Sequence, residues 1–298
     1  MTPNAPQTRP PLPATPDEMA FLRRAFARLV VAKVGVDDPR IEAAFAAVPR
    51  EAFLGRRPWH LPTRGAPVML PPDPVLAYQD AVIALLPGRG INNGEPSLHA
   101  RMIAALGLRE GERVAHLGAG TGYFSAILAR LVGESGHVLA VEHEAGLAGH
   151  AERTLAGDPQ VRAIAGDGLA LDLEGFDAVY VSFAVEDYPK TWLAALARGT
   201  RILAPLGART DGPGHTFATG AAYLLAPGEG GVAARFVSPA FFICAEGAEP
   251  VAPDHRARLA RAFAEGRPRD VSRLVLGSAV AEGEGDVFFA GEDWALCR

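Results

Sequence analysis

The sequence contains little cysteine and no long apolar run. Its two cysteines, Cys244 and Cys297, lie far apart, which indicates neither a disulfide framework nor a metal site. No apolar stretch approaches the roughly 20 residues that a membrane-spanning helix requires. The first residues lack a charged segment followed by an apolar one, so we expect no secretory signal. These absences predict a cytoplasmic protein without a membrane partner.

Runs of basic charge are also absent. The formal net charge is −5 at pH 7, and a chain without a basic cluster lacks the cations that neutralise phosphates, so we expect no nucleic-acid partner. With 298 residues and 49% hydrophobic content, the chain can form one large domain or a domain with an extension. The oligomeric state stays open, and a homodimer is one alternative.

The central feature is the stretch from Arg113 to Leu131, RVAHLGAGTGYFSAILARL. A short apolar run ends in Gly118, Gly120 and Gly122, and apolar residues then follow at helical spacing. Strand, glycine turn and helix form the first unit of a nucleotide-binding α/β fold. The glycines let the backbone approach a ligand with no Cβ in the way, and the helix N-terminus offers it free N–H groups.

The spacing of these glycines favours S-adenosylmethionine (SAM) over a dinucleotide. A dinucleotide fingerprint, G-x-G-x-x-G/A, needs its third small residue where this chain has Tyr123. The third glycine is Gly122 instead, which gives the G-x-G-x-G form associated with SAM sites. We predict that the three glycines and Tyr123 bind SAM, with S-adenosylhomocysteine as the product, although Tyr123 could also pack in the core.

Two acidic residues follow at the ends of the next predicted strands. Glu142 ends the next apolar run, where its carboxylate can accept hydrogen bonds from both ribose hydroxyls. Asp167, followed by Gly168, ends the third strand, where it can accept a hydrogen bond from the adenine amino group. The alternatives are a solvated helix cap for Glu142 and a plain Asp turn for Asp167. Since these loops occur in order at strand ends, we predict that all three residues bind the cofactor.

The chain divides into four predicted parts. Residues 1–16 are rich in proline and are expected to form a disordered arm. Residues 17–96 are expected to be a helical and loop segment on the substrate side. Within it, residues 54–87 are irregular, and such a long loop is typical of a lid or substrate-binding segment. Residues 97–245 form the predicted SAM-binding domain, and residues 246–298 form a small C-terminal extension.

The order of these pieces resembles the protein-L-isoaspartate O-methyltransferase family over roughly residues 38–240. The resemblance rests on Val48-Pro-Arg-Glu-Ala-Phe53, Tyr78 with Asp80, Ala100-Arg101-Met102, the glycine loop, Glu142, Gly166-Asp167-Gly168 and Ala204-Pro-Leu-Gly207. It implies an α/β fold with a doubly wound, mostly parallel, seven-stranded Rossmann-like sheet. It also implies a SAM-dependent methyltransferase whose N-terminal helical segment covers the substrate side.

The predicted acceptor loop departs from the family pattern. The family has Thr-Ile-Ser at this point, and its serine sits beside the methyl-accepting carboxylate. This chain has Asn92, Asn93 and Gly94 instead, so glycine stands at the serine position. These three residues are nevertheless the candidate catalytic residues, because amide N–H donors can hold a carboxylate without titrating. Asn-Asn-Gly is also an ordinary turn sequence.

Two histidines lie near the glycine strand. His116 stands where the family has an acid two residues before the first glycine. The resemblance places it near the amino-acid end of SAM, and the alternative is a buried histidine with satisfied hydrogen bonds. His99 lies on the preceding predicted helix, where we expect a packed or surface residue.

The chemistry of methyl transfer favours a carboxylate acceptor. The reaction is an in-line displacement, and positioning alone can supply about 7–11 kcal/mol of a barrier. A carboxylate with a pKa of about 4 is already ionised at neutral pH and needs no base, which fits a chain without an evident His–Asp or Lys base. We predict a carboxyl O-methyltransferase acting on an isoaspartyl or aspartyl-type carboxylate in a protein or peptide. The alternatives are a small-molecule O-methyltransferase and a non-catalytic SAM-binding sensor or scaffold.

Overall fold

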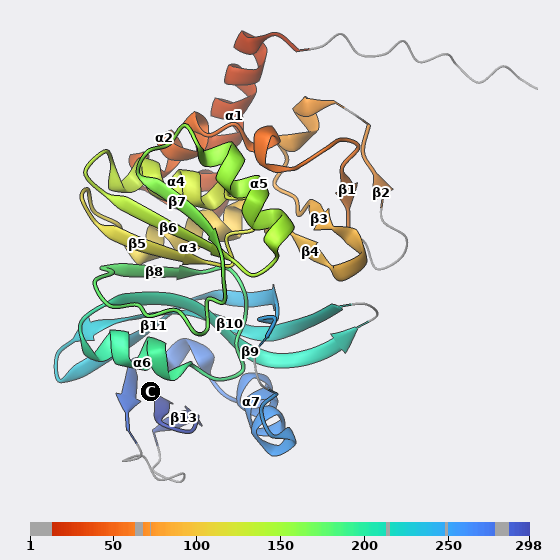
Figure 1. Ribbon diagram of the computed structural model, residues 1–298. Helices are drawn as coiled ribbons and strands as arrows, with labels where there is room; N and C mark the ends of the chain where they lie inside the picture. Colours follow the sequence, from red (N-terminus) through yellow and green to blue (C-terminus); the bar gives the residue numbers. More distant parts are fainter. Residues whose placement is uncertain (1–13, 63–67, 72, 213–214, 248–249, 278–285) are drawn as a thin grey trace, which may run out of the picture.

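The computed structural model describes residues 14–62, 68–71, 73–212, 215–247, 250–277 and 286–298 (Figure 1). Residues 1–13 of the predicted arm lie outside this part of the chain. Within it, a ten-stranded sheet runs through the molecule with helices on both faces, and a four-stranded sheet lies beside it. None of the described helices has the length and apolar character needed to cross a bilayer.

The glycine stretch forms the centre of the large sheet. The first strand, β5 (Arg113–Leu117), pairs in parallel with β6 (His137–Glu142) on one side and with β8 (Ala178–Val181) on the other. The sheet continues in parallel to β7 (Val161–Ala165) beyond β6 and to β9 (Arg201–Gly212) beyond β8. The order of strands therefore reverses at β5, and α/β sheets bind ligands beyond the carboxyl ends of their strands at such a point.

The other half of the sheet is antiparallel throughout. β10 (His215–Gly228) and β11 (Gly231–Ile243) form an antiparallel hairpin, and β12 (Arg273–Leu276), β14 (Trp294–Cys297) and β13 (Val287–Ala290) extend the sheet outward in that order. The α/β class is confirmed, but the count of seven strands is not: β5 to β11 supply seven, joined by four parallel and two antiparallel pairings, within a sheet of ten. Short turns such as the one between β10 and β11 can join only antiparallel neighbours, and the C-terminal residues add three strands.

Helices cover both faces of the sheet, and each face has its own apolar core. One core lies under α1 (Pro16–Val34), α2 (Pro39–Ala47), α3 (Pro96–Leu106), α4 (Tyr123–Val132) and α5 (Ala145–Leu155), and the other lies under α6 (Lys190–Ala197) and α7 (Pro253–Glu265). Successive side chains of β5 divide between them: Val114 packs in the first core, and Ala115 packs in the second. This alternation is that of a strand buried on both faces.

The region predicted as an irregular loop contains regular structure. Its short strands β1 (His60–Leu61), β2 (Val68–Met69) and β3 (Ala84–Leu86) form the smaller sheet together with β4 (Ile91–Asn92), which follows the region. The 3₁₀ helices η1 (Arg50–Phe53), η2 (Pro74–Ala77) and η3 (Pro87–Arg89) lie between and around these strands. A further 3₁₀ helix, η4 (Pro268–Asp270), precedes β12. The region of the smaller sheet has a small apolar core of its own, and Trp59 and Ile83 are among the buried residues of that core.

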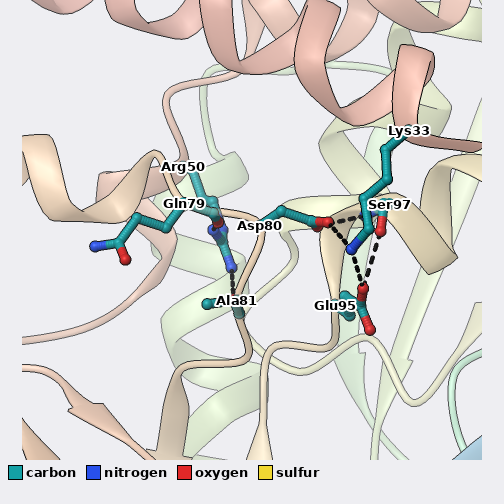
Figure 2. A network of polar contacts seen from close by, with 7 residues as sticks. All are labelled: Lys33, Arg50, Gln79, Asp80, Ala81, Glu95 and Ser97. Carbon is teal, nitrogen blue, oxygen red and sulfur yellow. Dashed lines mark hydrogen bonds and ion pairs between the residues drawn. The ribbon is translucent and has the colours of Figure 1, made fainter.

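A buried arginine fixes the middle of this region. Arg50 has no solvent exposure and donates hydrogen bonds to the carbonyls of Ala77 at 2.7 Å, Gln79 at 2.6 Å and Ala81 at 2.8 Å. Figure 2 draws Arg50 with Gln79 and Ala81. Burial lowers the pKa of its guanidinium to about 10. Three carbonyl acceptors compensate the buried charge, so one side chain holds residues 77–81 in place.

A second cation joins this region to two helices. Lys33, near the end of α1, lies 2.6 Å from the Asp80 carboxylate and 2.8 Å from that of Glu95 (Figure 2). Asp80 also accepts the backbone N–H of Ser97 in the first turn of α3 at 2.8 Å. These contacts fix the segment that leads into α3. The candidate acceptor loop lies in this segment.

Candidate active site

A cavity of about 1400 Å³ opens beyond the carboxyl ends of β5 and β8. Its walls come from the glycine loop, the chain before α3, and the β10–β11 hairpin. Among the predicted site residues, it is lined by Asn92, Asn93, Gly94, Gly118, Gly120 and Tyr123. One cavity therefore joins the predicted cofactor loop to the predicted acceptor loop.

The glycine loop has a shape that other residues could not adopt. Gly118 has φ 76° and Gly122 has φ 93°, in the left-handed region that favours glycine. A Cβ on Gly118 would lie 2.6 Å from the Phe183 ring, and one on Gly122 would lie 2.6 Å from Leu155. Gly122 is also the N-cap of α4. The loop thus presents bare backbone and a helix N-terminus to the cavity, which fits a nucleoside cofactor.

Glu142 lies against this loop. One carboxylate oxygen accepts the Gly120 N–H at 2.7 Å, and the other accepts the Glu144 N–H at 2.9 Å. Burial raises the pKa of Glu142, while these two backbone hydrogen bonds act in the opposite direction. The carboxylate is therefore held at the edge of the glycine loop, although Glu142 is not among the residues that line the cavity.

Some of the residues predicted to bind the cofactor do not line the cavity. Asp167 is exposed, and its Oδ1 accepts the Leu169 N–H at 2.9 Å, which is the geometry of an Asp turn. Gly168 is buried beside Leu117. Neither Asp167, Gly168 nor Gly122 lines the cavity.

The acceptor loop combines a turn with a buried amide. Asn92 shapes the turn, because its Oδ1 accepts the Gly94 N–H at 2.9 Å and its Nδ2 donates to the Gly90 carbonyl at 3.0 Å. Asn93 is 8% exposed, and its Oδ1 accepts the Ile83 N–H at 2.7 Å. Among the described residues, no group accepts a hydrogen bond from Asn93 Nδ2. Because Asn93 also lines the cavity, a ligand oxygen is a candidate partner for this buried donor.

His116 is a satisfied buried histidine. It is 1% exposed, its Nδ1 lies 2.8 Å from Ser125 Oγ, and its Nε2 lies 2.9 Å from Ser182 Oγ. Burial lowers the pKa of the imidazole to about 3, so it is neutral at physiological pH. Tyr123 both lines the cavity and packs against Phe53 at a centroid distance of 5.8 Å.

Residues that the sequence analysis did not assign to the site also line the cavity. His99 is packed as expected, but it lines the cavity as well, and its place on the buried face of α3 could have been found from its helical spacing with Met102 and Ile103. Ser182 lines it directly after β8. Phe217 and Phe241 come from neighbouring strands and stack at a centroid distance of 4.5 Å. No local pattern marks these two phenylalanines.

The fold and the cavity together define a class. A parallel sheet half with a G-x-G-x-G loop, an acid at the end of the second strand and a cavity at the switch point is the arrangement of a Rossmann-like SAM-dependent methyltransferase. Within the described residues, no cluster of histidine, cysteine and acidic side chains could hold a metal ion.

Comparison with known proteins identifies the family. The sequence model of the protein-L-isoaspartate(D-aspartate) O-methyltransferase family matches residues 27–217. A Rhodopseudomonas palustris (strain HaA2) protein named protein-L-isoaspartate O-methyltransferase 1 is 35% identical over 205 residues, which cover 67% of this chain and 75% of that protein. The chain belongs to this family of SAM-dependent methyltransferases.

Other relatives agree with this assignment. A Thermotoga maritima protein-L-isoaspartate O-methyltransferase is 31% identical over 183 residues, covering 59% of this chain and about half (53%) of that protein. A solved protein-L-isoaspartate O-methyltransferase shares the fold with a TM-score of 0.61 at 23% identity, covering 92% of this chain and 87% of that one. A Plasmodium falciparum structure titled as a putative member, in complex with S-adenosyl-L-homocysteine, has a TM-score of 0.57 at 15% identity, covering 76% and 99%.

Proposed function

We propose that this chain transfers the SAM methyl group to an isoaspartyl or aspartyl-type carboxylate in a protein or peptide. Its family supports this, and so does a cavity that joins a cofactor loop to an acceptor loop. SAM supplies an electrophilic methyl group when bound. The protein's own residues then have to hold the acceptor carboxylate in line with that methyl group and exclude water.

The cofactor has a set of candidate contacts around β5, β6 and β7. The backbone of Gly118, Gly120 and Gly122 would face the cofactor, and Glu142 would accept hydrogen bonds from the ribose hydroxyls. Each Glu142 oxygen already accepts one backbone N–H, and a carboxylate oxygen can accept a second donor. We assign Asp167 and Gly168 to the adenine side, where the exposed Asp167 carboxylate can accept from the amino group.

One observation carries the acceptor assignment: Asn93 Nδ2 is a buried donor that has no partner among the described residues. Burying a donor without a partner costs about 1–3 kcal/mol, which a ligand oxygen can recover. An amide donor suits a carboxylate acceptor because it does not titrate. A substrate carboxylate at Asn93 would also leave Asn92 and Gly94 in their structural roles, as the turn that shapes the wall of the cavity.

Transfer of labelled methyl from SAM to paired isoaspartyl and aspartyl peptides tests the proposal. We expect label on the isoaspartyl or the aspartyl peptide, and we expect mild base to release it, as it would from an ester. Label that resists base, or label on amines or phenols with none on the carboxyl peptides, would remove the proposal. Transfer to small carboxylic acids alone would favour the small-molecule alternative.

The Asn93→Asp variant tests the Asn93 Nδ2 donor separately from the Asn93 Oδ1 acceptor. It keeps an oxygen that can accept the Ile83 N–H but replaces the amide donor with a charged oxygen facing the acceptor carboxylate. We expect kcat/KM for the peptide to fall by about a hundredfold or more, since a favourable charged hydrogen bond becomes a repulsion. SAM affinity should be unchanged. Equal loss of SAM affinity would indicate a general collapse of the site.

A cytoplasmic location, the absence of a nucleic-acid partner and a homodimer stay predictions from the sequence. The roles of the separate parts of the chain are likewise proposals. Residues 17–96 would supply the acceptor side, residues 97–245 would supply the cofactor side, and residues 246–298 would support the sheet from behind.

A further inference from the structure

The side chain of His99 fills the space that a side chain at position 94 would need. Gly94 has φ 72°, and a Cβ built on it would lie 2.1 Å from His99 Nε2. Both residues line the cavity. The position at which the family has a serine therefore has no side chain of its own here, and an imidazole nitrogen from α3 occupies the place.

The imidazole is held rigidly in this place. It stacks on the Phe124 ring at a centroid distance of 3.8 Å and an interplanar angle of 5°, and it contacts the edge of Phe242. Its Nδ1 lies 2.6 Å from the Tyr180 hydroxyl. Within the described residues, Nε2 has no hydrogen-bonding partner. The ring nitrogen next to Gly94 is thus the one left for a ligand.

Tyr180 lies between His99 and His116. Its hydroxyl contacts His99 Nδ1 at 2.6 Å, and its ring packs against the His116 ring at a centroid distance of 5.2 Å. His116 has hydrogen bonds of its own, since Ser182 Oγ lies 2.9 Å from Nε2 and Ser125 Oγ lies 2.8 Å from Nδ1. The two departures from the family pattern are therefore both linked to Tyr180, His116 directly and Gly94 through His99.

The contact with Tyr180 determines which nitrogen of His99 carries the proton. Burial, followed by the nearby His116 and Arg50, lowers the pKa of His99 well below its usual value, so the ring is neutral and carries one N–H. Burial raises the pKa of Tyr180 well above its usual value, so the phenol keeps its proton. Among the described residues, His99 Nδ1 at 2.6 Å is the hydrogen-bond partner of that hydroxyl, and a phenol that donates to Nδ1 leaves Nε2 as the N–H donor.

We infer that His99 binds the methyl-accepting carboxylate through Nε2–H, in the place of the family serine, and that Tyr180 holds it in the donor tautomer. This inference rests on the proposed function. It extends that function by adding a second neutral donor beside Asn93, and it names the residue that compensates for Gly94. A carboxylate matches such a pair of donors, whereas an amine or a hydroxyl would bring its own proton to them.

The test uses the full chain and the isoaspartyl or aspartyl peptide that the unmodified protein methylates. His99→Phe keeps a ring that can stack on Phe124 but removes Nε2–H. We expect it to lower kcat/KM by about ten- to hundredfold, the range for losing a hydrogen bond to a charged group, and His99→Ala to lose as much. Tyr180→Phe removes the donor to Nδ1 but keeps the imidazole, and we expect a loss of up to about tenfold. SAM affinity should change in none of them.

A rescue experiment separates binding from packing. In His99→Ala the space beside Gly94 is empty, so adding Gly94→Ser should place a hydroxyl there and restore part of the lost kcat/KM. Gly94→Ser alone should be poorly active, because its Cβ would overlap His99 Nε2. Near-normal activity of His99→Phe would overturn the inference while leaving the proposed function intact. An unmodified protein that methylates neither peptide would overturn both.

A measurement on the unmodified protein does not depend on the variants folding. In ¹⁵N spectra with S-adenosylhomocysteine and the peptide bound, we expect a protonated Nε2 and an unprotonated Nδ1 for His99, with the Nε2 resonance shifting when the peptide is added. His99→Phe assigns the signals. A protonated Nδ1 in the bound state would overturn the inference.

Discussion

The backbone N–H of Gly120 donates a hydrogen bond to the Glu142 carboxylate across 2.7 Å. This contact joins the turn after β5 to the end of β6, so the shape of the cofactor loop and the position of the acid depend on each other. A nucleoside held by this acid would meet a loop that is already in its bound shape. Such preorganisation reduces the ordering cost of binding.

Replacement of Glu142 by glutamine tests this relationship. Glu142→Gln loses the charge and one of two acceptors, so we expect SAM affinity to fall about ten- to hundredfold, in line with losing one or two hydrogen bonds to a charged group. Calorimetric titration with SAM measures the change. Glu152→Gln, on the exposed face of α5, is the matched control and should bind as the unmodified chain does. An unaltered affinity in Glu142→Gln would mean that the ribose lies elsewhere.

The glycine loop also predicts a difference between two glycine-to-alanine changes. Gly122→Ala forces a Cβ to within 2.6 Å of Leu155 Cδ1 at a φ of 93°. We expect a loss of unfolding free energy of about 1–3 kcal/mol, from overpacking and left-handed strain. Gly157→Ala meets nothing within 4 Å and has no such φ, so it should change stability by less than about 0.5 kcal/mol. Denaturant titration compares the two, and equal effects would show that the loop tolerates a side chain.

The parts of the fold that the sequence predicted are those set by local pattern. The strand, turn and helix around Gly118 occupy one continuous stretch, and Glu142 follows the next strand directly. Each of these features can be recognised within about 30 residues, because spacing and turn chemistry determine it.

The features that the sequence did not predict depend on contacts between distant residues. Residues 54–87 look irregular, and their order comes from Arg50, which bonds carbonyls 27 to 31 positions away. The strand β12 pairs with β11 through its backbone, and no local sequence pattern marks that pairing. His99 reaches the acceptor loop because α3 places it beside Gly94, and no spacing rule gives that distance. Tertiary packing decided each of these cases.

The ion pair between Lys33 and Asp80 predicts a dependence of stability on pH. Burial acts to raise the pKa of Asp80, but hydrogen bonds from Lys33 and Ser97 outweigh it, so the pKa lies below its usual value. A carboxyl with a lowered folded-state pKa stabilises the protein above the unfolded value of about 3.9, and this contribution is lost as the pH falls through the folded-state pKa.

We therefore expect Asp80→Asn to lower the unfolding free energy at pH 7. A loss of about 1–2 kcal/mol is reasonable, because the Asp80 side chain is 8% exposed while Lys33 is half exposed. The difference in unfolding free energy between the variant and the unmodified chain should become smaller below about pH 4. Denaturant titrations at a series of pH values measure it, with Asp37→Asn, an exposed aspartate between α1 and α2, as the control. A gap that is constant with pH would rule out the titration of Asp80 as its source.

The C-terminal strands are predicted to fold together with the methyltransferase sheet. Trp294 of β14 is 2% exposed, packs against Tyr188 at a centroid distance of 4.6 Å, and donates its indole N–H to Asp187. Because Tyr188 and Asp187 belong to the chain after β8, we expect Trp294→Ala to destabilise the whole protein by about 3–5 kcal/mol. The loss should occur in a single transition, followed alike by fluorescence and circular dichroism.

The matched control for this change is Phe21→Ala, since Phe21 is 64% exposed on α1 and its removal should cost less than about 0.5 kcal/mol. SAM affinity of Trp294→Ala, measured well below its melting temperature, should equal that of the unmodified chain, because Trp294 does not line the cofactor cavity. Two separate transitions, with only the smaller one shifted by the change, would mean that residues 246–298 fold independently. In that case the ten-stranded sheet would consist of two units that fold separately, and truncation after β11 would leave a stable methyltransferase.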